Sequence, residues 1–232
     1  MTLPPSVQPD ILYLDETFLV LNKPAGLLSV PDGYQSSLPH LKSVLEPLYG
    51  PIFIVHRLDR DTSGVILVAR TTQAHQELNR QFREREVKKI YRALICGCPP
   101  WQEFLAEFPL RANADRRHRT RVDFDRGQPA TTEFRILQSC ALAALLEASP
   151  RTGYTHQIRS HLAYCGFPIM ADPLYTYQSQ PPDPGWMPRL ALHACQISFV
   201  HPLSRKLCSF AAPDPADFAA AAARLLEEET AH

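Results

Sequence analysis

Residues 55–70 have the sequence Val55-His56-Arg57-Leu58-Asp59-Arg60-Asp61-Thr62-Ser63-Gly64-Val65-Ile66-Leu67-Val68-Ala69-Arg70, which joins a dense polar cluster to an apolar run. The run 65–69 is rich in β-branched residues and is bounded by Gly64 and Arg70, which predicts a short buried strand. The polar cluster then lies in the loop before that strand. Its carboxylates, guanidiniums, imidazole and hydroxyls are costly to hold near a core unless they pair with one another. We therefore expect a functional site in this loop.

Asp59 is the carboxylate of this loop that we expect to point inward. It lies between Leu58 and the strand that enters the core. A solvated surface loop is the alternative, and it is the usual environment of an isolated Asp-Arg-Asp tripeptide. Leu58 favours the functional interpretation, because an apolar side chain inside the cluster draws the loop toward the core.

Composition narrows the class of protein. The chain has 232 residues and a formal net charge of zero, so any surface that binds nucleic acid must come from local clustering of basic residues. We find no signal or transit peptide and no apolar run of membrane-spanning length, and we expect a soluble cytoplasmic protein. The six cysteines lack any Cys-x-x-Cys pair, and we expect them to be reduced core residues rather than a zinc site.

The pattern along the chain predicts alternating strands and helices without a repeat or a long linker, and hence one domain over residues 1–232. Apolar runs at 11–14 and 18–21 predict a hairpin, and Thr71 is a candidate N-cap for a helix reaching about Glu86. Further strands are expected at 87–95, 131–137, 141–148 and 189–200, the last in the chain. Further helices are expected at 38–48, 218–229 and from Thr155 to about Cys165.

Two further segments carry charge in unusual settings. Residues 111–121 hold five arginines in eleven positions, which favours a phosphate-contacting arm over a solvated insertion. Arg159 lies next to Ile158 on the apolar face of the helix expected from Thr155, and a guanidinium there needs a carboxylate partner. Asp59 and Asp61 are the candidate partners.

Five motifs, in the same order along the chain, resemble those of the RluA-type pseudouridine synthases over nearly the whole sequence. They are Asn22-Lys23-Pro24-Ala25-Gly26, His56 to Gly64, Lys89-Ile90-Tyr91-Arg92-Ala93-Leu94, Gly153-Tyr154-Thr155-His156-Gln157-Ile158-Arg159, and Leu192-His193-Ala194 followed by Phe199-Val200-His201-Pro202. The resemblance implies an α+β fold with a mixed, largely antiparallel central sheet flanked by helices and loops. Two positions depart from the family pattern: Tyr154 replaces the usual Arg, and Ala171 replaces the usual Gly before Asp172.

The resemblance also implies an activity, namely isomerisation of uridine within RNA. The N-glycosidic bond breaks, the uracil turns, and a carbon–carbon bond forms through C5. Asp59 would act as nucleophile or as base toward the ribose, and Arg159 would hold Asp59 ionised and oriented through a bidentate contact. Tyr91 would stack on the uracil, and Arg57 would fill the gap left by the extruded nucleotide.

The remaining implications concern partners. We expect RNA contacts from six arginines: Arg57, Arg60, Arg116, Arg117, Arg119 and Arg121. The expected substrate is a structured stem-loop of ribosomal or transfer RNA, bound by a monomer. No cofactor or metal is implied, and no N-terminal RNA-binding module is expected, because about ten residues precede the first strand.

Two other classes of protein remain as alternatives. An aspartic hydrolase is suggested by Asp61-Thr62-Ser63-Gly64, but that chemistry needs two carboxylates that share a proton, and the chain has no second such loop. A non-catalytic RNA-binding module would explain the arginines and Tyr91, but it assigns no role to Asp59.

Overall fold

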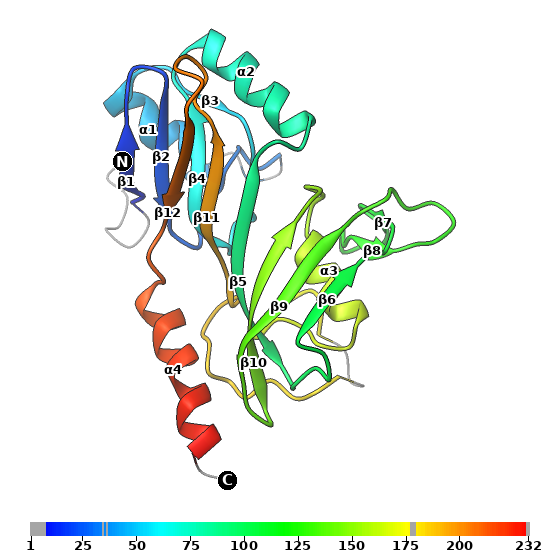
Figure 1. The fold of residues 1–232 in the computed structure, drawn as a ribbon. Coiled ribbons are helices and arrows are strands. Elements are labelled where there is room, and N and C mark those ends of the chain that lie inside the picture. The colour runs from blue at the N-terminus through cyan, green and yellow to red at the C-terminus, as the bar shows by residue number, and fades with distance from the viewer. Residues whose placement is uncertain (1–7, 34, 36, 177–179, 231–232) are drawn as a thin grey trace. The chain divides into compact units, whose positions relative to one another are not determined.

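The computed structural model describes residues 8–33, 35, 37–176 and 180–230, and it has an α+β fold with a large, mostly antiparallel sheet content. The expected fold class is therefore confirmed. The chain forms two compact units (Figure 1). Unit 1 comprises Met1–Lys89 and Ala194–Pro213, and unit 2 comprises Ile90–His193 and Asp214–His232.

The predicted strand after the polar loop is the centre of unit 1. This strand, β4 (Ser63–Ala69), is buried at every position. It pairs antiparallel with β2 (Phe18–Lys23), which in turn pairs with β1 (Asp10–Leu14) in the expected hairpin. An apolar run buried on both faces explains why the sequence shows no alternation here.

The other strands of unit 1 flank this centre, and Figure 1 draws them side by side. β11 (Leu192–Val200) is the neighbour of β4, and β3 (Phe53–Ile54) also pairs with β4. β12 (Leu207–Ala211) pairs antiparallel with β11, so the expectation that 189–200 holds the last strand is wrong. β12 was missed because it is only five residues long and Ser209 interrupts its apolar residues.

Two helices of unit 1 confirm the predicted segments. α1 (Leu41–Tyr49) begins after a capping box at His40. α2 (Thr72–Arg83) begins after Thr71, whose hydroxyl accepts a hydrogen bond from the backbone N–H of Ala74. Ala74 and Leu78, which lie one turn apart on α2, are both buried.

The strands of unit 2 pair antiparallel in the order β5-β10-β9-β6. The bounds are β5 (Lys88–Cys96), β6 (Glu103–Ala106), β9 (Thr132–Ser139) and β10 (Ala143–Pro150). A two-stranded ribbon, β7 (Leu110–Arg111) and β8 (Arg121–Val122), encloses the arginine-rich segment. The helices α3 (Gln157–Tyr164) and α4 (Ala216–Thr230) pack against this sheet, and Phe218 and Leu225 of α4 are part of its apolar core.

The cysteines only partly match the expectation. All six are free thiols, but only Cys96 is buried, and Cys98 is exposed. The prediction that they are core residues is therefore wrong for most of them, because a cysteine between apolar neighbours in the sequence can still face outward on a strand. Over the described ranges, no helix is long and apolar enough to cross a membrane.

Candidate active site

Asp59 lies on a backbone segment that is held by hydrogen bonds on both sides. The Ser29 hydroxyl donates to the carbonyl of Leu58 (2.8 Å) and accepts from its N–H (3.0 Å). The N–H of Thr62 donates to the carbonyl of Asp59 (3.2 Å), closing a turn over 59–62. Leu58 is 5% exposed whereas Asp59 is half-buried. The carboxylate thus sits on a fixed backbone at the border between core and solvent.

Lys23 also holds this segment by hydrogen bonds. It is fully buried at the end of β2, and its Nζ donates to the carbonyls of Pro24 (2.9 Å), Leu27 (2.8 Å) and Arg60 (3.1 Å). The N–H of Gly26 donates to the carbonyl of Arg60 as well (2.8 Å). The first motif of the family resemblance therefore fixes the backbone of the second, a role that the sequence did not reveal.

Gly64 is required by the close approach of β11. Its φ is +114°, and a Cβ at this position would lie 2.2 Å from the carbonyl oxygen of Ala194. Any other residue would push β4 and β11 apart or shift the turn that carries Asp59.

His56 is a structural residue of the loop. Its Nε2 accepts a hydrogen bond from the N–H of Leu67 (2.9 Å), and its ring stacks on Phe82 at 4.7 Å. Burial, with a smaller contribution from the charge of Lys89, lowers the pKa of His56 to about 3. The imidazole is therefore neutral at physiological pH, and it serves as an acceptor that ties the loop to β4.

Arg159, in unit 2, is 4% exposed and forms a bidentate ion pair. Its Nε donates to Oδ2 of Asp172 and its Nη2 donates to Oδ1, each at 2.8 Å. Its Cζ lies 5.1 Å from the ring centre of Tyr175. The expectation that a guanidinium here needs a carboxylate is confirmed, but Asp172 was missed as a partner because it lies thirteen residues away on an irregular segment. A pairing of Arg159 with Asp59 stays a prediction.

Helix α3 begins two residues later than expected. Its first residue is Gln157 instead of Thr155, its N-cap is His156, and no side chain caps it. The side chain of Gln157 holds the segment before the helix: its Oε1 accepts from the N–H of Tyr154 (3.1 Å) and its Nε2 donates to the carbonyl of Thr131 (3.0 Å). The helix starts late because His156 has a left-handed backbone conformation (φ 55°, ψ 22°), which a right-handed helix cannot include.

Two non-glycine residues beside Arg159 have left-handed backbone conformations. His156 has φ of 55° and Ala171 has φ of 53°. Ala171 is the position where the family usually has Gly, so the structure explains the family preference: glycine adopts this conformation without steric cost. The N–H of Ala171 donates to Oδ2 of Asp183 (2.6 Å), which helps to hold the turn.

Tyr91 lies on β5 in unit 2, opposite Ala148 of β10. It is half-buried and packs against the core of that unit. Its neighbour Arg92 forms an ion pair with Asp214. The ring is thus partly packed and partly accessible to solvent, which suits a ring that stacks on a base.

The arginine hairpin, defined as residues 111–122, is organised by one carboxylate. Oδ2 of Asp115 contacts Nε of Arg119 (2.7 Å) and Nε of Arg121 (3.0 Å). Burial alone would raise the pKa of Asp115, but hydrogen bonds from Arg119 and the backbone lower it to about 2. Arg116, Arg117 and Arg121 are exposed, whereas the side chain of Arg119 is only 11% exposed.

The predicted site residues fall into two groups. Asp59, Arg57, Arg60 and Asp61 share the loop of unit 1, where Arg57 and Arg60 are exposed. Unit 2 holds Arg159, Tyr91 and the arginine hairpin. Within the described part of the chain, no group of three or more His, Cys, Asp or Glu side chains is placed to hold a metal ion.

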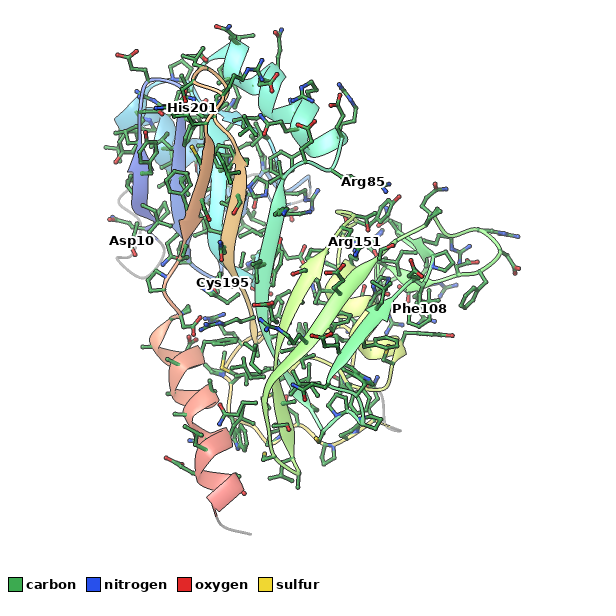
Figure 2. The ribbon with its side chains drawn as sticks, viewed as in Figure 1. Asp10, Arg85, Phe108, Arg151, Cys195 and His201 are labelled. Carbon is green, nitrogen blue, oxygen red and sulfur yellow. The ribbon has the colours of Figure 1, made fainter. Side chains whose placement is uncertain are left out.

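Side chains around α3 explain why Arg159 stands on a rigid element. His161 is fully buried, and its Nε2 lies 3.0 Å from the carbonyl oxygen of Phe108, a residue labelled in Figure 2. Burial lowers the pKa of His161. A neutral His161 that donates from Nε2 fixes α3 to the segment before β7.

A family model described as RNA pseudouridylate synthase matches residues 17–164. The chain is 40% identical to "Dual-specificity RNA pseudouridine synthase RluA" of Pasteurella multocida over 205 residues, 88% of this chain and 92% of the relative. It is also 40% identical to the protein of the same name from Escherichia coli K12 over 209 residues, 90% and 93% of the two chains. The chain belongs to the RluA-type RNA pseudouridine synthases.

Solved structures agree with this membership. "Human RNA Pseudouridylate Synthase Domain Containing 4" superposes with a TM-score of 0.78 at 25% identity, covering 94% of this chain and 93% of that one. "Human RNA Pseudouridylate Synthase Domain Containing 1" superposes with a TM-score of 0.76 at 26% identity, covering 93% of this chain and 87% of that one. The synthase is an isomerase that acts on RNA, and this activity is favoured over the non-catalytic binding module and the aspartic hydrolase.

Proposed function

We propose that Asp59 is the catalytic carboxylate of this synthase and that Asp61 is a structural residue of the same turn. The observation that carries the proposal is the fixed backbone on either side of Asp59, which comes from Ser29, Lys23 and Gly26. A side chain that must attack or deprotonate a ribose gains rate from such fixed geometry. Its half-buried position suits a group that meets a nucleotide arriving from solvent.

The reaction redistributes bonds within one nucleotide. The bond between C1′ and N1 breaks, and a bond between C1′ and C5 forms after the uracil turns. The proton on C5 is then lost to a base, and N1 takes up a proton, so the product is an isomer of the substrate. One carboxylate that serves as nucleophile or as base toward the ribose, and is regenerated at the end, meets the requirement.

Arg159 and Tyr91 are proposed to complete the site. Arg159 would orient Asp59, and its own orientation is supported by the fork with Asp172. Tyr91 would stack on the uracil, supported by its half-buried ring on β5. Arg57 is exposed on the loop that carries Asp59, and there it can replace the extruded nucleotide in the RNA stack. The whole chain would then work as one catalytic domain.

The proposed substrate is a stem-loop of structured RNA. Exposed arginines on both units, namely Arg57, Arg60, Arg116, Arg117 and Arg121, can contact phosphates, whereas Arg119 maintains the shape of the hairpin. The relatives are named dual-specificity RNA pseudouridine synthases, which supports a range wider than one RNA. We propose uridines in ribosomal and transfer RNA, modified in the cytoplasm by a monomer.

Release of tritium from RNA labelled at C5 of uridine tests the proposal. Wild-type protein should release tritium from a stem-loop, Asp59→Ala should fall to background, and Asp61→Ala should remain active. Asp59→Asn should bind the same RNA as the wild type does, because the arginines are untouched. Activity in Asp59→Ala, or loss only in Asp61→Ala, would reverse the assignment.

A further inference from the structure

We infer that Tyr175 is a positioning residue of the synthase, which sets the orientation of Arg159 and links it to the arginine hairpin. The inference rests on the proposed role of Arg159. Tyr175 is 1% exposed, so it acts through its neighbours and not through contact with RNA.

The first observation concerns the two side chains that hold the Arg159 guanidinium, Asp172 and Tyr175, which we call the seat of Arg159. The fork with Asp172 fixes Arg159 along one edge, through Nε and Nη2. The ring of Tyr175 lies 5.1 Å from Cζ and offers its face to the cation. Asp172 also accepts hydrogen bonds at Oδ1 from the N–H groups of Leu174 (2.9 Å) and Tyr175 (3.3 Å). The carboxylate and the ring that hold Arg159 therefore belong to one short, internally bonded segment, residues 172–175.

The second observation is how the Tyr175 hydroxyl is used. It donates to the carbonyl of Thr120 (2.9 Å) and accepts from the N–H of the same residue (2.8 Å). Nδ1 of His156 lies 3.2 Å from the same oxygen. A phenol has one donor and two acceptor sites, so with Nδ1–H as a third partner its capacity is fully used. A ring needed only for packing would not require this hydroxyl.

The third observation is that Thr120 belongs to the arginine hairpin. Two arginines of the hairpin also reach the 172–175 segment: Nη2 of Arg117 donates to the carbonyl of Pro173 (2.8 Å), and Nη1 of Arg119 donates to that of Leu174 (3.0 Å). The hairpin and the segment that seats Arg159 are thus joined at three consecutive residues. A phosphate that displaces the hairpin displaces the ring and the carboxylate that hold Arg159.

Tyr175→Phe tests the inference, because it removes the hydroxyl and leaves the ring under Arg159. We expect the single-turnover rate of tritium release to fall about 10- to 100-fold, the size of loss that a small misplacement of a catalytic group produces. The dissociation constant for RNA should stay within about twofold, since no RNA contact is removed. Tyr13→Phe is the control: it removes another tyrosine hydroxyl, which donates to Oδ2 of Asp15 in unit 1, and its rate should equal that of the wild type.

A double-mutant cycle separates positioning from general stability. If Tyr175 acts through Arg159, then Tyr175→Phe should add little to the rate loss of Arg159→Lys, whereas independent effects would multiply. His156→Gly is a second variant whose fold should persist, because φ of 55° suits glycine. It removes one partner of the hydroxyl, and its rate should fall by less than that of Tyr175→Phe.

Three outcomes would overturn the inference: a wild-type rate in Tyr175→Phe, losses that multiply in the cycle, or a loss of affinity as large as the loss of rate. These outcomes differ from failure of the proposed function, in which Asp59→Ala would retain activity whatever Tyr175 does. An inactive wild type would count against both.

Discussion

Removing the charge of Asp172 should expose how much the seat of Arg159 contributes to folding. Asp172→Asn keeps the shape of the side chain but replaces an ionised acceptor with a neutral amide. The side chains of Arg159 and Asp172 are 5% and 0% exposed, so the guanidinium cannot turn to solvent when its partner loses charge. The expected result is a large loss of stability.

The magnitude follows from the two hydrogen bonds of 2.8 Å in the fork. A hydrogen bond to a charged group contributes about 1.5–3 kcal/mol. Breaking one side of a buried ion pair typically costs about 3–5 kcal/mol, because an uncompensated charge remains in the core. We expect Asp172→Asn to lower the free energy of unfolding of unit 2 by about 3–5 kcal/mol.

Urea unfolding followed by tryptophan fluorescence measures this quantity, because both tryptophans, Trp101 and Trp186, lie in unit 2. The matched control is Asp217→Asn. Asp217 forms the same fork with Arg189, at 2.7 and 2.8 Å, but the side chains are 20% and 31% exposed. Its loss should be no more than about 1 kcal/mol. Equal losses in the two variants, or a loss below about 1 kcal/mol for Asp172→Asn, would refute the reasoning from burial.

Two further predictions concern stability. His56 has a pKa lowered by burial to about 3, so below its ordinary value of 6.5 the unfolded chain binds a proton that the folded chain does not. The stabilisation from this group should therefore be complete above pH 6.5 and should fall toward pH 3, by at most about 1.4 kcal/mol per pH unit. Urea titrations followed by circular dichroism at several pH values measure this fall, and His56→Phe should lose less stability than the wild type as the pH is lowered. Equal dependence of stability on pH in the two proteins would contradict the assignment. Ala171→Gly should raise the stability of unit 2 by about 1 kcal/mol, because φ of 53° is strained for alanine. The same change at Ala163, inside α3, should lower stability by about 1 kcal/mol, and a loss in both variants would count against strain at Ala171.

The sequence predicted the elements that have either a continuous apolar run or a regular apolar face. β4 is buried throughout, and α2 has a clear apolar face and a capping threonine, so both follow from local patterns. The strands β6 and β12 were missed because they are short, at four and five residues, and each contains a polar residue, Glu103 or Ser209. Short edge strands take their structure from pairing with a neighbour, and such pairing leaves little trace in the sequence.

The candidate site shows the same division between local and distant information. Lys23, Asp59 and Arg159 lie in motifs, whereas the partners of Arg159 do not. Asp172 and Tyr175 lie on a segment with no regular secondary structure, and no periodicity places that segment beside α3. The one local signal was the need of a guanidinium for a carboxylate at a buried helix position, which predicted that a partner exists but not which residue it is.

The departure from the family at Ala171 shows how the seat of Arg159 is maintained. Alanine in the left-handed region costs about 1–2 kcal/mol, and His156 at the other end of the seat incurs a similar cost. Each strained residue has a side-chain hydrogen bond beside it: Asp183 accepts from the N–H of Ala171, and the ring of His156 contacts the hydroxyl of Tyr175. Strain of this kind persists only where the surroundings over-determine the backbone, and it clusters at functional sites. Both residues flank one guanidinium, so the fold accepts local strain where the orientation of Arg159 is set.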